Sequence, residues 1–570
     1  MSKEQTELRR WLEEVTDPEL SAELLSIRNE EKEVHERFYR SLEFGTGGLR
    51  GELGAGTNRM NIYTVRQATQ GFAAYLLTQN KAPSAAISYD SRHKSDVFAR
   101  ETARVLAANG VKVYLYPHLM PTPALSFAVL DRRCEGGVMV TASHNPARYN
   151  GYKAYAADGA QISGEVAAAV SAEIEKTDIF DDVKLVDFEE ALAAGTIEYI
   201  DNALIERYYA AVMAQALRPE LGKTAGLRLV YTPLNGSGLV PVMTVLKRIG
   251  HTDITVVPEQ EKPDGDFPTC PYPNPEILEA MQLGLSLCEK LGADLLLATD
   301  PDSDRVGTAV LQNGAPRLIS GNEMGVLLLD YICRTRLELC KMPENPVAVR
   351  SIVSTTMSDA VAAHYGVEMR QVLTGFKYIG EQIAHLEAEG HPERFLFGFE
   401  ESYGYLSGGY VRDKDAVVAS MLICEMAAWY KGLGKNLGEA LDDLYAQYGY
   451  YFNKVDSYTF PGSDGMEKMA ALMQKLRTEL PSVIGSRAVT GHTDYETGLR
   501  YEDGEGKTPT GLPAADVMEF RFGKEGSLVA RPSGTEPKLK FYYSLRASDR
   551  AAAEAAYGEI KASVERWLGL

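Results

Sequence analysis

The stretch AAISYDSRHKSDVFARETARVLAANGVKVYLY, residues 85–116, decides the fold of this chain. Two apolar runs, residues 85–89 and 111–116, flank a segment over residues 96–109 whose apolar side chains recur at helical spacing, and Gly110 ends that segment. The pattern predicts a strand, a helix and a second strand, which is the unit from which parallel and mixed sheets are built. The expected fold class is therefore α/β.

The composition has room for several such units. The chain has 570 residues, of which 45% are hydrophobic, and at roughly 150 residues per domain this predicts three to four domains. The same alternation of strand and helix patterns recurs over residues 227–257 and 293–333. A formal net charge of -20 argues against general binding to nucleic acid or to anionic membranes, so positive charge at any anion site must be local.

The cysteines and the N-terminus predict a cytoplasmic protein. The six cysteines form no CxxC pair, and none lies at zinc-ligand spacing from a histidine, which favours reduced thiols in a cytosolic setting. The first residues are polar, and no apolar run approaches the about 18 residues that a membrane span needs. We therefore expect neither a secretory signal nor a transmembrane helix.

A reactive serine is predicted where an apolar run ends. The run over residues 137–140 is followed by Thr-Ala-Ser-His-Asn-Pro, residues 141–146. Pro146 fixes its own φ and lacks an N–H, so the strand must give way to a turn. This places the Ser143 hydroxyl on a loop beside His144. The alternative is a capped turn in which Ser143 and Asn145 bond only local backbone.

An acidic loop follows a second apolar run. Residues 293–298 precede Asp-Pro-Asp-Ser-Asp-Arg, residues 300–305, and three carboxylates at this spacing repel one another unless a cation lies among them. Mg²⁺ takes such oxygen ligands together with a substrate phosphate. A calcium EF-hand is excluded because the sixth position is Arg305 rather than glycine and the twelfth is Leu311 rather than glutamate. The alternative is a solvated acidic turn.

Two further loops suit a phosphorylated sugar. In residues 531–540, Arg-Pro-Ser-Gly-Thr-Glu-Pro-Lys-Leu-Lys, small residues let backbone N–H groups form an anion-binding nest, and Arg531 adds a fork for phosphate. Neither a Walker loop nor a GxGxxG fingerprint is present, so no nucleotide site is implied. Residues 397–405, Phe-Gly-Phe-Glu-Glu-Ser-Tyr-Gly-Tyr, combine acceptors with aromatic rings, as sugar hydroxyls require. A tight turn and an ordinary surface loop are the respective alternatives.

These four loops, in this order, resemble the signature loops of the α-D-phosphohexomutase superfamily, and most of all the long-chain phosphoglucomutase/phosphomannomutase group. The resemblance implies three related mixed-sheet α/β domains plus a smaller C-terminal α+β domain around a central cleft. The expected domains carry the phosphoserine loop, the metal loop, the sugar loop and the phosphate loop, over residues 1–200, 201–322, 323–450 and 451–570. The sugar loop reads Phe-Glu-Glu-Ser rather than Gly-Glu-Met-Ser, which leaves the sugar preference open.

The resemblance also implies roles for individual residues. Ser143 is the expected phosphorylated nucleophile, and its phosphoryl group would share one Mg²⁺ with Asp300, Asp302 and Asp304. Lys153, in Tyr-Asn-Gly-Tyr-Lys, is the expected general acid/base, with its pKa depressed by His144 and Arg305. Arg50, in Gly-Thr-Gly-Gly-Leu-Arg-Gly, is expected to face the reacting phosphoryl group. The expected substrate-binding residues are Glu400, Ser402, Lys377, Arg305, Arg531, Ser533, Gly534, Thr535 and Lys540.

The implied reaction interconverts glucose 1-phosphate and glucose 6-phosphate, because a phosphoryl group can pass between the distant O1 and O6 only by a relay through the enzyme. Glucose 1,6-bisphosphate would be the intermediate and activator, and mannose phosphates are second substrates. Open alternatives are a phosphopentomutase acting on ribose or deoxyribose phosphates, a glucose 1,6-bisphosphate synthase, a metal-dependent phosphatase and a non-catalytic sugar-phosphate-binding protein. The expected partners are small-molecule sugar phosphates, with no nucleic acid and no membrane. Monomer and dimer both remain open.

Overall fold

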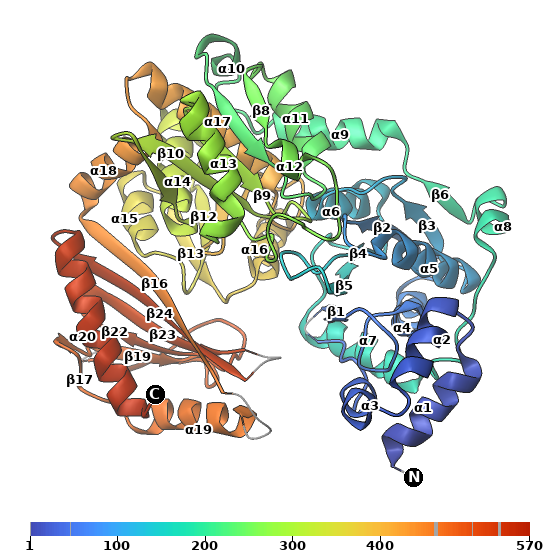
Figure 1. Cartoon of the computed structure of the whole chain (residues 1–570). Helices are drawn as coiled ribbons and strands as arrows, with labels where there is room; N and C mark the ends of the chain where they lie inside the picture. Colours follow the sequence, from blue (N-terminus) through green and yellow to red (C-terminus); the bar gives the residue numbers. More distant parts are fainter. Residues whose placement is uncertain (1, 46, 461–464, 504–505, 534–536) are drawn as a thin grey trace. The chain divides into compact units, whose positions relative to one another are not determined.

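The computed structural model describes residues 2–45, 47–460, 465–503, 506–533 and 537–570. The chain divides into two compact units, which we describe separately (Figure 1). Unit 1 comprises Met1–Ile319, Gly380–Phe395 and Tyr403–Asn436. Unit 2 comprises Ser320–Ile379, Leu396–Ser402 and Leu437–Leu570.

The first sheet of unit 1 is mixed and has six strands in the order β1-β5-β4-β2-β3-β6. Parallel pairing joins β2 to β3 and β4, and β3 to β6, whereas β5 runs antiparallel to β1 and β4. The strands are β1 (Gly48–Glu52), β2 (Ser84–Tyr89), β3 (Lys112–Leu115), β4 (Gly136–Val140), β5 (Tyr149–Ala156) and β6 (Ile197–Tyr199). The helices of this region are α4 (Ile62–Gln79), α5 (Ser95–Ala108), α6 (Thr122–Arg132), α7 (Gly164–Lys176) and α8 (Phe188–Ala193).

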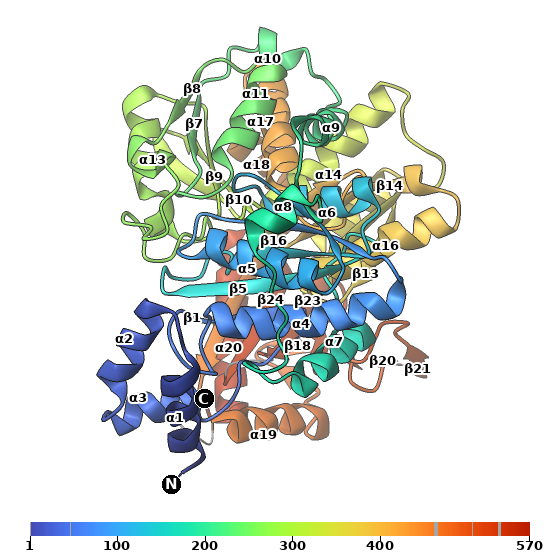
Figure 2. The same cartoon turned by 90° about the vertical axis from the view of Figure 1, so that its right-hand side faces the viewer.

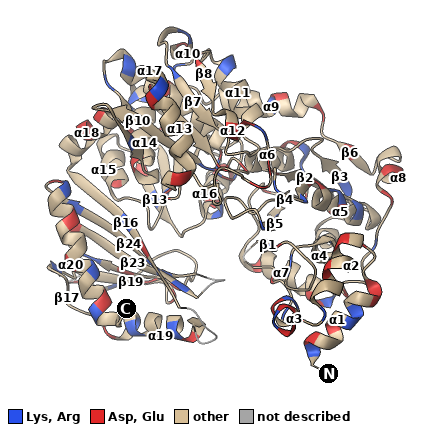
Figure 3. Ribbon diagram, viewed as in Figure 1, with Lys and Arg blue, Asp and Glu red and all other residues tan. Residues whose placement is uncertain are grey.

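The predicted strand-helix-strand unit is confirmed as β2, α5 and β3, each within about two residues of its expected bounds. Helices cover both faces of the sheet at β4, where an added Cβ on Gly136 would meet Phe72 of α4 at 2.8 Å and one on Gly137 would meet Val129 of α6 at 2.7 Å. Because successive residues of a strand point to opposite faces, α4 and α6 lie on opposite sides. Figure 3 shows no charged residue on β2 or β4.

Residues 178–201, which are polar in sequence, form structured parts of the same region. They contain α8 and β6, and β6 extends the sheet by pairing in parallel with β3. Asp187 caps α8 by accepting hydrogen bonds from the backbone N–H groups of Glu189 and Glu190. The polarity therefore reflects a helix cap and an edge strand rather than a linker.

The second sheet of unit 1 is also mixed, with five strands in the order β11-β10-β9-β7-β8. β7 pairs in parallel with β8 and β9, and β10 pairs antiparallel with β9 and β11. The strands are β7 (Leu229–Thr232), β8 (Ile254–Val256), β9 (Leu295–Thr299), β10 (Val306–Gln312) and β11 (Ala315–Ile319). The helices are α9 (Asn202–Met213), α10 (Leu221–Thr224), α11 (Leu239–Arg248), α12 (Pro258–Glu261), α13 (Leu278–Leu291) and α17 (Ala416–Gly432).

Three N-terminal helices form a small cluster of their own in unit 1: α1 (Lys3–Glu14), α2 (Pro18–Ile27) and α3 (Glu31–Phe38). Ser2 and Asp17 cap the first two by accepting backbone N–H bonds. Trp11 is fully buried in the cluster, where it makes edge-to-face contacts with Phe38 and Tyr63. Figure 2 shows these helices beside one another near the N-terminus.

An ion pair ties α1 to the segment after α7. Both carboxylate oxygens of Asp178 accept hydrogen bonds from Arg10, at 2.6 and 2.7 Å, and this guanidinium holds the pKa of Asp178 well below its usual value. A depressed carboxylate pKa contributes its full stability above the unfolded pKa of about 3.9, and this contribution is lost as the pH falls from that value through the lower pKa of the folded state.

Asp178→Asn is therefore expected to lower the melting temperature at pH 7 by about 1–3 °C, a small shift because the pair is partly exposed to solvent. The difference from wild type should begin to shrink as the pH falls below about 3.9 and should disappear only as the pH falls through the depressed pKa of folded Asp178, as measured by differential scanning calorimetry. Glu13→Gln, in an exposed pair with Arg9, is the control and should change little at either pH. An Asp178→Asn deficit that persists unchanged at low pH would contradict the assignment.

Unit 2 holds a small parallel pair and a larger antiparallel sheet. β12 (Val347–Ser351) pairs in parallel with β13 (Glu368–Val372) and lies between β13 and β14 (Phe395–Glu400). The helices here are α14 (Gly321–Glu338), α15 (Met357–His364) and α18 (Leu437–Tyr448). α16 (Phe376–Ala388) begins in unit 2, whereas its residues from Gly380 onward, η1 (Pro392–Arg394) and β15 (Gly404–Ser407) belong to unit 1.

The C-terminal sheet has seven antiparallel strands in the order β16-β24-β23-β22-β19-β20-β21. The strands are β16 (Tyr450–Thr459), β19 (Gly491–Asp494), β20 (Leu499–Glu502), β21 (Gly506–Pro509), β22 (Met518–Arg521), β23 (Gly526–Pro532) and β24 (Lys538–Ala547). The other elements are α19 (Gly465–Thr478), α20 (Arg550–Leu568), η2 (Gly523–Glu525) and the two-stranded pair β17 (Val483–Ile484) and β18 (Arg487–Ala488). The predicted C-terminal α+β domain is confirmed.

All six cysteines are free, and all but Cys340 are buried. Within the described residues, no single helix is long and apolar enough to cross a bilayer, and only α17 and α18 taken together pass on length and composition.

Candidate active site

Ser143 lies on the turn that follows β4, as predicted. Its φ is 51°, a left-handed conformation that a residue with a Cβ adopts only when its surroundings enforce it. The buried hydroxyl donates to Oδ2 of Asp300 at 3.0 Å and lies 3.1 Å from Nδ1 of His144. A local capped turn would bond only nearby backbone, whereas the Ser143 hydroxyl contacts Asp300, which follows β9 of the other sheet of unit 1.

The acidic loop follows β9 and is buried throughout. One carboxylate oxygen from each of Asp300, Asp302 and Asp304 lies within 4.8 Å of the other two. Burial and the other two carboxylates raise the pKa of Asp300 well above its usual value. Among the described residues, Oδ1 of Asp302 and Oδ1 of Asp304 are buried without a hydrogen-bond partner. Three close carboxylates with unsatisfied oxygens can bind a divalent cation.

Neighbouring segments of unit 1 hold this loop in place. Thr122, at the start of α6, donates from its backbone N–H to the carbonyl of Asp302 and from its hydroxyl to Oδ2 of Asp302, both at 2.9 Å. Ser237 donates from its N–H and its hydroxyl to the carbonyl of Pro301. An added Cβ on Gly236 would lie 2.4 Å from Cα of Pro301, so only glycine permits this approach. The loop is therefore rigidly placed beside Ser143.

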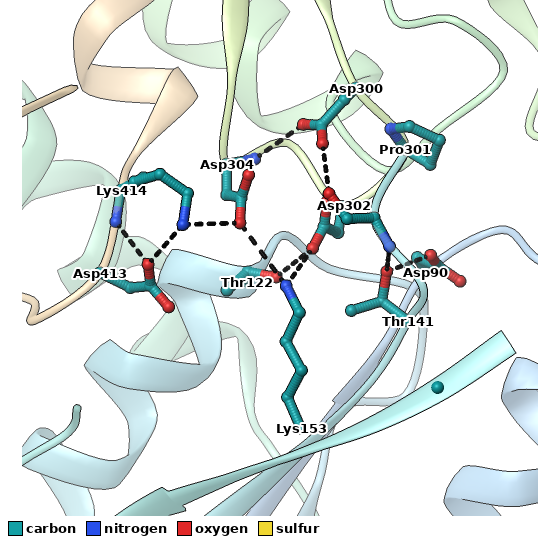
Figure 4. Close-up of polar contacts among 12 residues, drawn as sticks. Asp90, Thr122, Thr141, Lys153, Asp300, Pro301, Asp302, Asp304, Asp413 and Lys414 are labelled. Carbon is teal, nitrogen blue, oxygen red and sulfur yellow. Dashed lines mark hydrogen bonds and ion pairs between the residues drawn. The ribbon is translucent and has the colours of Figure 1, made fainter. Parts of the chain in front are cut away.

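Two lysines neutralise the carboxylates (Figure 4). Nζ of Lys153, from β5, lies 2.8 Å from Oδ2 of Asp302 and 3.6 Å from Oδ2 of Asp304. Nζ of Lys414 lies 3.2 Å from Oδ2 of Asp304 and 3.1 Å from Oδ1 of Asp413. The expected placement of Lys153 near the serine and the metal loop therefore matches the geometry.

The expected electrostatic environment of Lys153 is wrong. Burial lowers the pKa of Lys153, but the carboxylates of Asp302 and Asp304 outweigh burial, so the pKa lies above the usual lysine value. Burial lowers the pKa of His144 well below its usual range, and the charges of Arg305 and Arg50 lower it further. His144 is therefore neutral near pH 7 and cannot be the positive charge that lowers the pKa of Lys153. The neighbouring lysine whose positive charge does so is Lys414.

The two predicted arginines of unit 1 occupy different positions. Arg50 lies on β1, opposite Gly151 of β5, and its charge acts on His144. Arg305 follows the acidic loop, and its Nη1 donates to Oε1 of Glu276 at 2.8 Å. Both guanidiniums therefore contribute positive charge close to the Ser143 turn.

Sequence reasoning missed the segment that carries Lys414. Tyr155 donates to Oδ2 of Asp413 at 2.7 Å, and the carboxylate of Asp415 caps α17 and accepts from the hydroxyl of Tyr410 at 2.6 Å. The available signal was the charged run Arg-Asp-Lys-Asp, residues 412–415, directly before an apolar helix. Such a run beside a core helix is unlike a solvated surface loop.

The predicted sugar and phosphate residues lie in unit 2, except that two fall outside the described residues. Glu400, at the end of β14, is buried, and its Oε1 accepts from the N–H of Gly375 at 2.7 Å. Nζ of Lys377 lies 5.0 Å from the centre of the Tyr378 ring. Ser402 follows β14 by two residues, and Ser533 follows β23. Gly534 and Thr535 lie outside the described residues.

Within unit 2 the sugar and phosphate loops come together at Tyr542 of β24. In the register of the two neighbouring strands, Arg531 on β23 lies opposite Lys540 on β24. Burial raises the pKa of Tyr542 to about 12, with a further contribution from the charge of Glu401, while Arg531 opposes the shift. The charges of Glu401 and of Arg531, the predicted phosphate-binding arginine, therefore both act on the pKa of Tyr542.

Mixed α/β sheets with a buried serine against a carboxylate cluster define a phosphohexomutase-like protein. The models for the phosphoglucomutase/phosphomannomutase α/β/α domains I, II and III match residues 41–179, 206–313 and 320–448, and the model for the C-terminal domain matches residues 500–560. The chain therefore belongs to the phosphoglucomutase/phosphomannomutase family.

Individual relatives support this assignment. The phosphoglucomutase of Staphylococcus haemolyticus (strain JCSC1435) is 38% identical over 511 residues, which is 89% of this chain and 91% of the relative. A phosphoglucomutase/phosphomannomutase family protein from Burkholderia thailandensis shares the fold with a TM-score of 0.66 at 19% identity, covering 92% of this chain and 97% of its own. The Paramecium phosphoglucomutase parafusin does so with a TM-score of 0.68 at 16% identity, covering 93% and 97%.

Proposed function

We propose that this protein interconverts glucose 1-phosphate and glucose 6-phosphate through a phosphoserine enzyme. The observation that carries the proposal is the buried Ser143 hydroxyl, held 3.0 Å from Asp300, in an acidic cluster whose Asp302 is paired with Lys153. The relation to a named phosphoglucomutase over most of both chains supports the choice of glucose. The four-domain division at residues 200, 322 and 450 stays a prediction, and the free thiols favour a cytoplasmic location.

The residues present fit one Mg²⁺. Asp300, Asp302 and Asp304, together with the phosphoryl group on Ser143, would hold the ion. When bound, Mg²⁺ would offset the negative charge that spreads over the transferred phosphoryl oxygens. Arg50 and Arg305 add positive charge from the protein itself.

The covalent step passes a phosphoryl group from Ser143 to the free hydroxyl of the sugar phosphate. An O–P bond forms on the sugar as the bond to Ser143 Oγ breaks; the sugar hydroxyl loses a proton and Ser143 Oγ gains one. Lys153 is the proposed acid/base: its ammonium donates a proton to Ser143 Oγ as the O–P bond breaks, and the amine that results accepts the proton of the sugar hydroxyl. The raised pKa of Lys153 supports an ammonium as the starting form. Neutral His144 orients the Ser143 hydroxyl through Nδ1.

The resulting glucose 1,6-bisphosphate then turns and returns its other phosphate to Ser143. We assign the non-reacting phosphate to Arg531, Ser533, Gly534, Thr535 and Lys540. Glu400 and Ser402 are assigned to sugar hydroxyls, and Lys377 to the ligand more generally. The meeting of Arg531 and Glu401 at Tyr542 supports a shared role for the two loops.

Side-by-side kinetics on glucose, mannose, ribose and glucosamine phosphates test the substrate assignment. Glucose 1-phosphate should give the largest kcat/KM, with lower activity on mannose 1-phosphate. Dominance of ribose 1-phosphate would make the protein a phosphopentomutase, and net production of glucose 1,6-bisphosphate from a second phosphoryl donor would make it a synthase. Release of inorganic phosphate without isomerisation would indicate a phosphatase.

Lys414→Met should lower kcat by about 30-fold, because Asp304 and Asp413 lose the charge that balances them while the apolar stem is retained. The affinity for Mg²⁺ should rise, since one positive charge beside the carboxylates is gone. Calorimetric titration of Mg²⁺ and steady-state kinetics measure the two effects. Lys176→Met, at an exposed lysine, is the control; weaker Mg²⁺ binding in Lys414→Met would contradict the charge argument.

A further inference from the structure

The side chain of Arg92 is fully buried beneath the Ser143 turn, in the loop between β2 and α5. Its Nη2 donates to the carbonyl of Ser143 at 2.6 Å and to the carbonyl of Asn145. Its Nη1 donates to the carbonyls of Pro146 and Tyr149, both at 3.0 Å. The two terminal nitrogens therefore hold four carbonyls of one short segment.

Asp90 is the second charged group of this arrangement, and Figure 4 shows it beside Thr141. Oδ2 of Asp90 lies 3.4 Å from Nε of Arg92 and accepts from the hydroxyl of Thr141 at 2.6 Å. The hydroxyl oxygen of Thr141 in turn accepts from the N–H of Ser143 at 2.8 Å. The N–H of Ser143 is thus bonded to Thr141, which is bonded to Asp90, and the carbonyl of Ser143 is bonded to Arg92. Asp90 and Arg92 form one buried ion pair, which therefore fixes both backbone groups of Ser143.

The conformation of Ser143 explains why such fixing is needed. A φ of 51° at a residue with a Cβ is less favourable than an ordinary conformation. Buried carbonyls also need donors, because a buried carbonyl without one is destabilising. The planar guanidinium supplies several donors at once, and the ring of Phe267, whose centre lies 5.0 Å from Cζ of Arg92, packs beside it.

We propose that Arg92 is a positioning residue that holds the Ser143 hydroxyl in the orientation required for phosphoryl transfer. This inference rests on the proposed function. Arg92 holds the turn through its peptide groups, since the hydrogen bonds of its terminal nitrogens go to backbone carbonyls. A lysine keeps the charge but, as a compact ammonium with three donors, cannot hold four carbonyls.

The test measures the phosphorylation of Ser143 separately from overall turnover. Wild-type enzyme, Arg92→Lys and Arg92→Ala are first dephosphorylated on Ser143 and then mixed with glucose 1,6-bisphosphate labelled in its phosphates, and label on the Ser143 peptide is followed by rapid quench. Both variants should transfer label about 100-fold more slowly, the cost of misplacing a reacting atom by about 1 Å. The KM for glucose 1-phosphate should stay within about threefold, because substrate binding is untouched. Added guanidinium should restore about tenfold of the rate lost in Arg92→Ala.

Controls separate positioning from general destabilisation. Arg66→Ala removes another ion-paired arginine of unit 1, which lies 2.5 Å from Glu101; it should lower the melting temperature but leave the labelling rate unchanged. Asp90→Asn, which keeps an acceptor for Thr141 but loses the charge, should give an intermediate labelling rate and covers the case in which an Arg92 variant does not fold. Wild-type labelling rates in Arg92→Lys or Asp90→Asn would overturn the inference. No label on wild-type enzyme would instead overturn the proposed function.

Discussion

Ser143→Ala is expected to lower kcat by about 10⁴-fold or more, because removal of a covalent nucleophile leaves only binding and electrostatic effects. The structure supports so large a loss, since the hydroxyl is buried, held in a left-handed turn and in contact with both Asp300 and His144. The KM for glucose 1-phosphate should change little. Steady-state assays with purified Ser143→Ala and wild-type protein provide the measurement.

Mass spectrometry adds a second readout to this experiment. The wild-type protein should carry one phosphoryl group on the peptide that contains Ser143, and the variant should carry none. Ser171→Ala is the matched control, because the Ser171 hydroxyl only donates to the carbonyl of Phe44 at 3.0 Å, and it should keep full activity. Near wild-type turnover in Ser143→Ala would remove the relay from the mechanism.

Asp302→Asn should lower kcat by about 10³-fold, which corresponds to a loss of about 4 kcal/mol of transition-state stabilisation. Asp302 is the centre of the cluster, because its Oδ2 binds both Lys153 and Thr122 while its Oδ1 is buried without a partner among the described residues. An amide keeps the shape but removes the charge that attracts a cation and holds the Lys153 ammonium. Both metal binding and the acid/base group should therefore suffer.

Metal dependence distinguishes this effect from simple loss of fold. In wild-type protein, chelation should abolish activity, and added Mg²⁺ should restore it and raise the melting temperature by preferential binding to the folded state. Asp302→Asn should lose the Mg²⁺-induced rise. Asp253→Asn, in an exposed ion pair with Arg228, should behave as wild type. An Asp302→Asn protein that binds Mg²⁺ as tightly as wild type would show that the cluster is not the metal site.

Local sequence patterns predicted the strands and the loops that follow them. The apolar runs before Ser143 and Asp300 are β4 and β9, in which every residue is buried. Pro146 and the closely spaced carboxylates cannot continue a buried strand, so the chain turns after each of these strands. In unit 2, Glu400 is the last residue of β14, and Arg531 is the second-last residue of β23. These features depend on residues close in sequence, which is why the chain alone reveals them.

Charge balance could not be predicted in the same way. Lys414 is 110 residues away in sequence from Asp304, whose carboxylate it neutralises. No local sequence pattern indicates that pairing. The low pKa of His144 and the high pKa of Lys153 depend on burial and on Arg305, Arg50, Asp302 and Asp304 acting across two sheets. No local pattern indicates a role for Arg92, because only the fold brings its guanidinium to the carbonyls of the Ser143 turn.

The most direct test of the account is whether a phosphoryl group on Ser143 passes to substrate fast enough to support turnover. Wild-type enzyme labelled on Ser143 is isolated, mixed with excess glucose 1-phosphate and quenched at short times. We predict that label leaves the Ser143 peptide and appears in glucose 1,6-bisphosphate at a rate at least equal to kcat. Label that stays on the protein while isomerisation proceeds, or that resides on a residue other than Ser143, would contradict the account.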